Sequence, residues 1–269
     1  MTKRATYTAA VEAGTTWSFA RGESSKKKNE KLDYTVDIEL SDKLSVMDGS
    51  VTEFELDAIV NAANQSCMGG GGVDGAIHSA AGRLLRRECA KLNGCNRGEA
   101  KITKGYNLPA KYVIHTVGPI SGGSKTLHNC YYNSLSVAKK NGVRTLGFCM
   151  ISTGVFGFPL SSATKISLKA CRTFLEESKE NRDAIDRIVF VCYLRSEKVM
   201  YQKYLKYIFP IVTVTKEAVA EIKKQELEAQ AKSRSDSDDN DKDSDKDSDK
   251  ANAEDEDLSK WAPKRRQYY

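Results

Sequence analysis

The sequence has few of the residues from which metal sites and disulfide frameworks are built. It contains three histidines, and its seven cysteines form no Cys-x-x-Cys pair. An odd number of cysteines at these spacings fits neither a zinc site nor a small disulfide scaffold. We therefore expect reduced thiols, no metal and no resident cofactor, in a protein of the cytoplasm or the nucleus.

Long apolar runs are also missing. No run approaches the roughly 18 residues that a membrane-spanning helix needs, and the longest, residues 207–214, is interrupted by Pro210. The N-terminus has no hydrophobic signal region, although its basic, acid-poor start resembles a transit peptide. We expect a flexible basic arm over residues 1–31 and no membrane partner.

Charge is distributed unevenly along the chain. Residues 231–257 contain 12 acidic and 5 basic residues, a net charge of −7 within a chain of net charge +6, which leaves about +13 on the rest. Almost no apolar residue interrupts this stretch, so we predict a disordered charged tail over residues 233–269, after a helical extension over residues 211–232. The basic remainder favours an acidic partner, such as a nucleotide or a nucleic acid.

Between these ends, strand and helix patterns alternate over residues 32–210. Apolar, β-branched runs predict strands at 34–40, 57–61, 112–117, 145–151 and 187–193. Helical spacing predicts helices near 73–91, 126–141, 161–179 and 197–208. This alternation is typical of an α/β domain with a largely parallel sheet and helices on both faces, whose ligands bind at the carboxyl ends of the strands.

A glycine-rich stretch follows the second predicted strand, and residues 61–82 read NAANQSCMGGGGVDGAIHSAAG. Apolar residues at helical spacing predict that a helix begins near Val73. The unpaired N–H groups at its start, beside glycines without side chains, suit a phosphate. The run is neither the Rossmann nor the Walker pattern, so alone it is a weak signal.

Two polar pairs flank the glycines. Asp74 and His78 lie four residues apart on one face of the predicted helix, where the helix dipole should stabilise the Asp74 carboxylate. They are either a helix cap with a packed histidine or a catalytic pair. Asn61 and Asn64 end the preceding strand; they can cap a turn, and Asn64 can also bind a ribose hydroxyl.

Three stretches together resemble the macrodomain family, in its MacroD-type branch. They read DAIVNAANQSCMGGGGVDGAIHSAAG (57–82), GCNRGEAKITKGYNLPAKYVIHTVGP (94–119) and ISTGVFGFP (151–159). The resemblance covers about residues 45–210. It implies a three-layer α/β/α fold with a mixed, largely parallel sheet that binds ADP-ribose. It also implies hydrolysis of mono-ADP-ribose from acidic side chains of proteins and deacetylation of O-acetyl-ADP-ribose.

The resemblance also implies roles for individual residues. Asp74 would orient the attacking water, His78 would support it, and Asn64 would hold the proximal ribose. The adenine and ribose end would involve Ser50, Val51, Asn61 and Tyr193, with Tyr193 either stacked on adenine or part of the core. Two diphosphate loops would be formed by Gly69, Gly70, Gly71, Gly72 and Val73, and by Ser152, Thr153, Gly154, Val155, Phe156 and Gly157.

Two positions depart from the branch. Ser50 stands where the family usually has an acid that accepts a hydrogen bond from adenine, so we expect adenine to be held more weakly. Asp48 is an alternative acceptor, but two residues away its side chain is expected to point elsewhere. Phe156 stands where the branch often has tyrosine, which removes a hydroxyl contact.

The leading hypothesis is therefore a monomeric hydrolase that acts on mono-ADP-ribosylated proteins. The main alternative is a module that binds ADP-ribose without turnover. A nucleic-acid binder ranks third, because nothing in the sequence resembles an RNA-recognition motif.

Overall fold

In the computed structural model of the chain, residues 34–210 are described. The predicted arm, helical extension and tail lie outside these residues. Six strands are present: β1 Leu44–Asp48, β2 Ala58–Ala62, β3 Ala100–Lys104, β4 Tyr112–Thr116, β5 Thr145–Phe148 and β6 Arg187–Cys192. The helices are α2 Ile38–Asp42, the 3-10 helix η1 Val51–Glu53, α3 Gly72–Ala81, α4 Arg83–Ala90, α5 Ser124–Lys140, α6 Leu160–Glu177, α7 Lys179–Ala184 and α8 Arg195–Ile208.

The strands form one mixed sheet in the order β1-β6-β5-β2-β4-β3. All neighbours pair in parallel except β3, which runs antiparallel to β4 at the edge. The inner strands are nearly continuous runs of buried apolar residues, as expected for strands that are covered on both faces.

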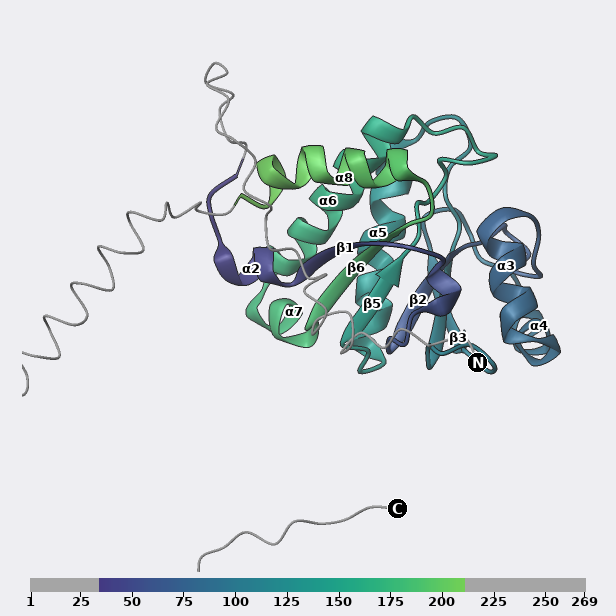
Figure 1. The fold of residues 1–269 in the computed structure, drawn as a ribbon. Helices are drawn as coiled ribbons and strands as arrows, with labels where there is room; N and C mark the ends of the chain where they lie inside the picture. Colours follow the sequence, from purple (N-terminus) through teal and green to yellow (C-terminus); the bar gives the residue numbers. More distant parts are fainter. Residues whose placement is uncertain (1–33, 211–269) are drawn as a thin grey trace, which may run out of the picture. The chain divides into compact units, whose positions relative to one another are not determined.

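Helices cover both faces of the sheet, which makes three layers. Alternate strand residues point to opposite faces, so Val60 and Phe190 pack with α5, α6 and α8, while Ile59 and Val189 pack with α3 and α4. Figure 1 shows α3 and α4 well separated from α6 and α8, with the strands between them. The predicted three-layer α/β/α fold is confirmed. Among the helices of residues 34–210, none combines the length and apolar character needed to cross a bilayer.

The start of the domain differs from the prediction. The strand predicted over residues 34–40 is wrong, because residues 38–42 form α2 and the first strand begins at Leu44. Asp37 caps this helix, since its side chain accepts a hydrogen bond from the Leu40 N–H at 3.0 Å. Val36 and Ile38, whose alternation suggested a strand, are 42% and 60% exposed. A local cap therefore outweighs the β-type pattern.

Three further features of the fold bear on the predictions. The helix predicted over residues 73–91 is two helices separated at Gly82, whose φ of 82° is outside the helical range. The antiparallel strand β3 was not predicted. Gly142, predicted to end a helix, follows α5 with a φ of 67° and donates a hydrogen bond to the Lys139 carbonyl at 3.2 Å.

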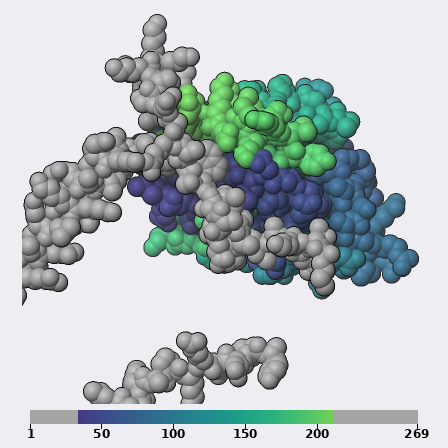
Figure 2. All heavy atoms as spheres, in the orientation of Figure 1, coloured from purple at the N-terminus to yellow at the C-terminus, as the bar shows by residue number. Residues whose placement is uncertain are grey.

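The parallel arrangement brings the carboxyl ends of β1, β2, β5 and β6 to one edge of the sheet. The segment around η1, purple in Figure 2, lies there between α8 in green and the α3–α4 pair in blue. Turns that are far apart in sequence therefore meet at this edge, where ligands of open α/β sheets bind.

Candidate functional site

A cavity of about 690 Å³ lies at the carboxyl ends of the parallel strands. Its walls come from the turns that follow β1, β2, β5 and β6. It brings together most of the predicted ligand-binding residues, namely Ser50, Val51, Gly71, Gly72, Val73, Ser152, Thr153, Gly154, Val155, Phe156 and Tyr193. Its size is within the usual range for small-molecule sites.

The second half of the glycine run forms the cavity wall at the start of α3. A Cβ atom on Gly71 or Gly72 would meet nothing within 4 Å, so neither glycine is required there by close protein contacts. The first N–H groups of an α-helix have no intrahelical partners, and at the start of α3 no side chain caps them, since the N-cap residue is Gly71. This wall therefore presents backbone donors and open space, which suits an anion.

The first two glycines of the run, Gly69 and Gly70, do not line the cavity. They cover the predicted catalytic residues Asn64, Asp74 and His78 instead. A Cβ atom on Gly70 would lie 3.2 Å from both the Asn64 Nδ2 and the Asp74 Oδ2. The Gly70 carbonyl oxygen lies against α3, 2.5 Å from where a Cβ on Gly75 would be. Gly75 was not predicted as a site residue, and it is the residue that permits this close approach.

Asp74 lies beneath this cover and is only 4% exposed. Its Oδ1 accepts a hydrogen bond from the Asn61 Nδ2 at 2.7 Å. Burial raises the pKa of Asp74, while the Asn61 hydrogen bond and the nearby His78 act in the opposite direction. The sequence predicted a carboxylate stabilised by the helix dipole, whereas in the structure the burial of Asp74 disfavours its charged form.

His78 lies one turn further along α3 and packs under Gly69. Its Nε2 is 3.5 Å from the Asp74 Oδ1, which is too long for a good hydrogen bond, and this nitrogen has no hydrogen-bond partner within the described residues. Burial lowers the pKa of His78, against the pull of the Asp74 carboxylate. The side chain therefore favours the neutral form beside the acid.

The two asparagines hold the surroundings of Asp74. Asn64 donates to the Gly69 carbonyl at 2.9 Å, while its Oδ1 accepts hydrogen bonds from the Ser66 N–H and hydroxyl. Asn61 is fully buried and faces Asp74 and His115. Neither asparagine lines the cavity. Asn64 holds the glycine loop through its hydrogen bond to Gly69, and Asn61 holds the Asp74 carboxylate.

The loop after β5 forms the opposite wall. Ser152 has a φ of 67°, is 6% exposed, and its Oγ has no hydrogen-bond partner in the described part of the chain. A Cβ atom on Gly118 would lie 2.0 Å from this oxygen, so Gly118 makes room for it. Val155 is 99% exposed at the rim, and Gly157 lies outside the lining.

The far end of the cavity carries the residues predicted to meet adenine. The Ser50 Oγ lies 2.7 Å from the Thr52 Oγ1, and Asp48 pairs with Lys198, so Asp48 does not replace the missing acid. Tyr193 is 80% exposed at the cavity, which excludes the alternative that it belongs to the core.

Glu197 at this end was missed by the sequence analysis. Its side chain is buried, lines the cavity and accepts hydrogen bonds from the Tyr193 and Leu194 N–H groups at 2.8 and 3.0 Å. Its position in the first turn of a predicted helix was the available signal, because an acid there can satisfy free backbone donors.

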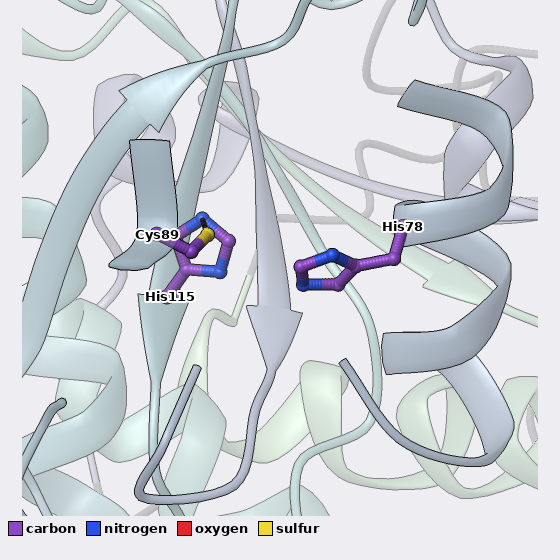
Figure 3. Close-up of side chains that lie close together, drawn as sticks. All are labelled: His78, Cys89 and His115. Carbon is purple, nitrogen blue, oxygen red and sulfur yellow. Dashed lines mark hydrogen bonds between the residues drawn. The ribbon is translucent and has the colours of Figure 1, made fainter. Parts of the chain in front are cut away.

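One group among the described residues has the composition of a metal site. Ligand atoms of His78, Cys89 and His115 all lie within 4.8 Å of one another (Figure 3). Both ring nitrogens of His115 already have hydrogen-bond partners, and burial raises the pKa of the Cys89 thiol to about 12. A metal would have to displace these hydrogen bonds and the thiol proton, so the arrangement favours a hydrogen-bonded network.

Comparison with known proteins identifies relatives of this chain. A family profile described as "Macro domain" matches residues 60–167. ADP-ribose glycohydrolase MACROD1 of Rattus norvegicus is 46% identical over 198 residues, which cover 71% of this chain and 75% of the rat protein. ADP-ribose glycohydrolase MACROD2 of Xenopus laevis is 49% identical over 177 residues, 64% of this chain and 42% of the frog protein.

Solved structures give the same result. The Trypanosoma brucei macrodomain in complex with ADP-ribose matches with a TM-score of 0.60 and 51% sequence identity. The match covers 62% of this chain and 71% of the trypanosome chain. Among the sequence relatives, a macro domain-containing protein of Methanosarcina mazei is 43% identical over 189 residues, which cover 68% of this chain and 99% of that protein.

Proposed function

This chain belongs to the Macro domain family, in its MacroD-type branch, and we propose that it binds ADP-ribose and hydrolyses mono-ADP-ribose from acidic side chains of proteins. The relatives named as ADP-ribose glycohydrolases support the activity. The observation in the chain itself that carries the proposal is the pair of facing loops, with Gly71, Gly72 and Val73 on one wall and residues 152–156 on the other.

The two walls suit a diphosphate. The start of α3 supplies N–H groups without intrahelical partners, and the buried Ser152 hydroxyl is available on the other side. With the diphosphate between these donors, adenine would lie toward Tyr193 and the distal ribose toward Gly70 and Asp74. Donors held in place in this way stabilise negative charge without rearrangement.

The proposed reaction is hydrolysis of an ester. The bond between the ribose and the protein carboxyl group breaks, one fragment takes the hydroxyl of a water molecule and the other takes its proton, and the products are ADP-ribose and a free carboxylic acid. The Asp74 Oδ1 is committed to Asn61, so Oδ2, next to Gly70, is the oxygen that would orient the water. General base assistance of this kind contributes roughly 10²–10⁴-fold. The acetyl ester of O-acetyl-ADP-ribose is a second substrate of the same chemistry.

The burial of Asp74 favours a second candidate function. A carboxylate that is 4% exposed is well placed to support the glycine loop, as a module that binds ADP-ribose without turnover would need. Release of ADP-ribose from a protein modified on aspartate or glutamate separates the two functions, when calorimetry with free ADP-ribose is run in parallel. Tight binding without release would favour the binding module.

A further inference from the structure

A buried row of hydrogen bonds connects Asp74 to the edge of the sheet. The Asn61 Nδ2 lies 2.7 Å from the Asp74 Oδ1 and 3.1 Å from the His115 Nδ1. The His115 Nε2 lies 2.9 Å from the Thr103 Oγ1. All four side chains are at most 4% exposed. Asn61 and His115 are directly paired on β2 and β4, so the sheet register fixes their contact.

The chemistry of the partners fixes the direction of these bonds. An ionised Asp74 only accepts, so Asn61 must present its amide nitrogen to it. The second hydrogen of the same nitrogen faces the His115 Nδ1, which must therefore be unprotonated. A neutral His115 then carries its proton on Nε2, which has two partners: the Thr103 Oγ1 at 2.9 Å and the Cys89 Sγ at 3.6 Å. It donates to the Thr103 hydroxyl, the nearer of the two, and this hydroxyl lies 3.5 Å from the Val113 carbonyl oxygen.

A proton on the His115 Nδ1 would break the hydrogen bond between Asn61 and Asp74. If His115 carried its proton on Nδ1, Asn61 would have to turn its carbonyl oxygen toward His115 and, with it, toward the Asp74 carboxylate. In the structure this carbonyl oxygen has no hydrogen-bond partner within residues 34–210. The Asn61 amide nitrogen thus donates to both Asp74 and His115, while its carbonyl oxygen has no hydrogen-bond partner within the described residues.

We propose that His115 is a positioning residue for Asp74: its Nε2-protonated, neutral ring holds the Asn61 amide in the orientation that donates to the Asp74 carboxylate. This inference rests on the proposed function for its effect on turnover. Burial lowers the pKa of His115 to about 3, so the ring stays neutral over the pH range of an assay. Figure 3 shows His115 beside Cys89, with His78 directed toward them from α3.

Other titratable groups also face Asp74 from the elements packed around it. They are His78 on α3, Cys67 in the glycine-rich stretch, Cys89 on α4 and Cys149 after β5. Burial raises the pKa values of Cys89 and Cys149 to about 12, so neither changes charge near neutral pH. His78 and Cys67 are kept in every variant below. His115→Phe also removes the contact of the His115 Nε2 with the Cys89 Sγ at 3.6 Å, whereas Thr103→Val leaves both His115 and Cys89 in place.

The kinetic test compares two disruptive variants with two matched controls. His115→Phe removes the nitrogen that accepts the hydrogen bond from Asn61. Thr103→Val removes the hydroxyl oxygen that accepts the hydrogen bond from the His115 Nε2–H. Both should lower kcat about tenfold, leave KM within about twofold, and move the acid limb of the kcat profile to higher pH, because Asp74 loses a hydrogen bond that favours its charged form. Thr103→Ser keeps the hydroxyl, and His128→Phe changes a histidine outside the row; both should behave as wild type.

A spectroscopic test does not depend on turnover, and its result is read in the wild-type protein. The chain has three histidines, so ¹⁵N chemical shifts of the wild-type imidazoles can be assigned by single substitutions. We expect His115 to be neutral with its proton on Nε2 from pH 5 to 8. A proton on Nδ1, or a titration of His115 in this range, would overturn the proposal.

The two proposals can fail separately. If the wild type binds ADP-ribose but releases none from modified protein, the proposed function fails. The role of His115 is then decided by the ¹³C titration of the Asp74 carboxyl group, whose midpoint should be higher in Thr103→Val than in wild type and Thr103→Ser. Equal midpoints in the three proteins would contradict the positioning role.

Discussion

The guanidinium group of Arg97 lies over the ring of Phe156, 5.7 Å from its centroid. The same side chain donates from Nη1 to the Gly118 carbonyl oxygen at 2.7 Å. Both Phe156 and Gly118 line the cavity, and the Phe156 carbonyl oxygen accepts a hydrogen bond from the Ser121 N–H. Arg97 therefore holds the second loop from outside the cavity.

Replacing Arg97 should weaken the binding of ADP-ribose more than it slows the hydrolysis step. Arg97→Met removes the cation–π contact and the hydrogen bond to Gly118, each worth about 1 kcal/mol. We expect the Kd for ADP-ribose and the KM for modified protein to rise roughly 5- to 20-fold, with kcat changed less. Calorimetry and steady-state kinetics measure this. Arg83→Met, at an exposed arginine of α4, is the control, and an equal effect in both variants would count against this role for Arg97.

Gly71 offers a test that separates ligand binding from stability. Its φ is −97° and a Cβ atom there would meet no protein atom within 4 Å, so Gly71→Ala should unfold at the wild-type temperature. The added methyl group would project into the space proposed for the diphosphate and should weaken ADP-ribose binding at least tenfold. Thermal unfolding and calorimetry measure the two effects. Unchanged affinity would mean that the ligand does not approach this wall.

Ser50 is the position where a carboxylate should improve binding. In Ser50→Asp, the new acid can accept a hydrogen bond from the adenine amino group, and hydrogen bonds to charged groups are worth about 1.5–3 kcal/mol. We expect ADP-ribose to bind roughly tenfold more tightly or better. An inosine analogue that lacks the amino group is the control ligand. If both ligands gain equally, the new contact is not with adenine.

The burial of Asp74 also predicts a pH dependence of stability. Because the pKa of Asp74 is raised in the folded protein, the folded state holds a proton more strongly than the unfolded chain. Stability from this group is therefore complete below the ordinary value of 3.8 and is lost as the pH rises through the raised folded pKa. Asp74→Asn should accordingly unfold at a higher temperature than wild type at pH 7, and the difference should close toward pH 3.

Asp186 provides a control of opposite sign. The hydrogen bond and charge of Arg144 lower the pKa of Asp186, so its contribution to stability is present at neutral pH and lost in acid. Asp186→Asn should therefore be slightly less stable than wild type at pH 7.

Equal pH profiles of stability for wild type and Asp74→Asn would show that burial does not disfavour the charge on Asp74.

Local sequence patterns indicated the layers of the fold and a phosphate-binding glycine loop before a helix, whereas the second loop, residues 152–157, was implied only by the resemblance to the macrodomain family. Apolar runs such as residues 57–61 and 187–193 are long and bounded, and the four glycines directly precede a helical pattern. These patterns lie within short stretches of the chain, so they can be recognised without knowledge of the tertiary structure. The strand predicted at residues 34–40 failed because the Asp37 cap and the exposure of Ile38 are visible only in the structure.

The environment of the candidate catalytic residues could not be predicted in the same way. The burial of Asp74 depends on Gly70 lying against Gly75, and its main partner Asn61 is positioned by pairing with His115 on another strand. Arg97 acts through contacts with Phe156 and Gly118, which lie far from it in the sequence. Such contacts depend on packing, for which one sequence offers no periodic signal.

The central claim is that Asp74 turns a site that binds ADP-ribose into one that hydrolyses its ester. The most direct measurement is release of ADP-ribose from a protein mono-ADP-ribosylated on aspartate or glutamate, by wild type and by Asp74→Ala, with the Kd for free ADP-ribose measured for both. The account predicts release by wild type, loss of release in Asp74→Ala, and Kd values within a few-fold of each other. Release by Asp74→Ala at the wild-type rate, or no release by a wild type that binds ADP-ribose, would contradict it.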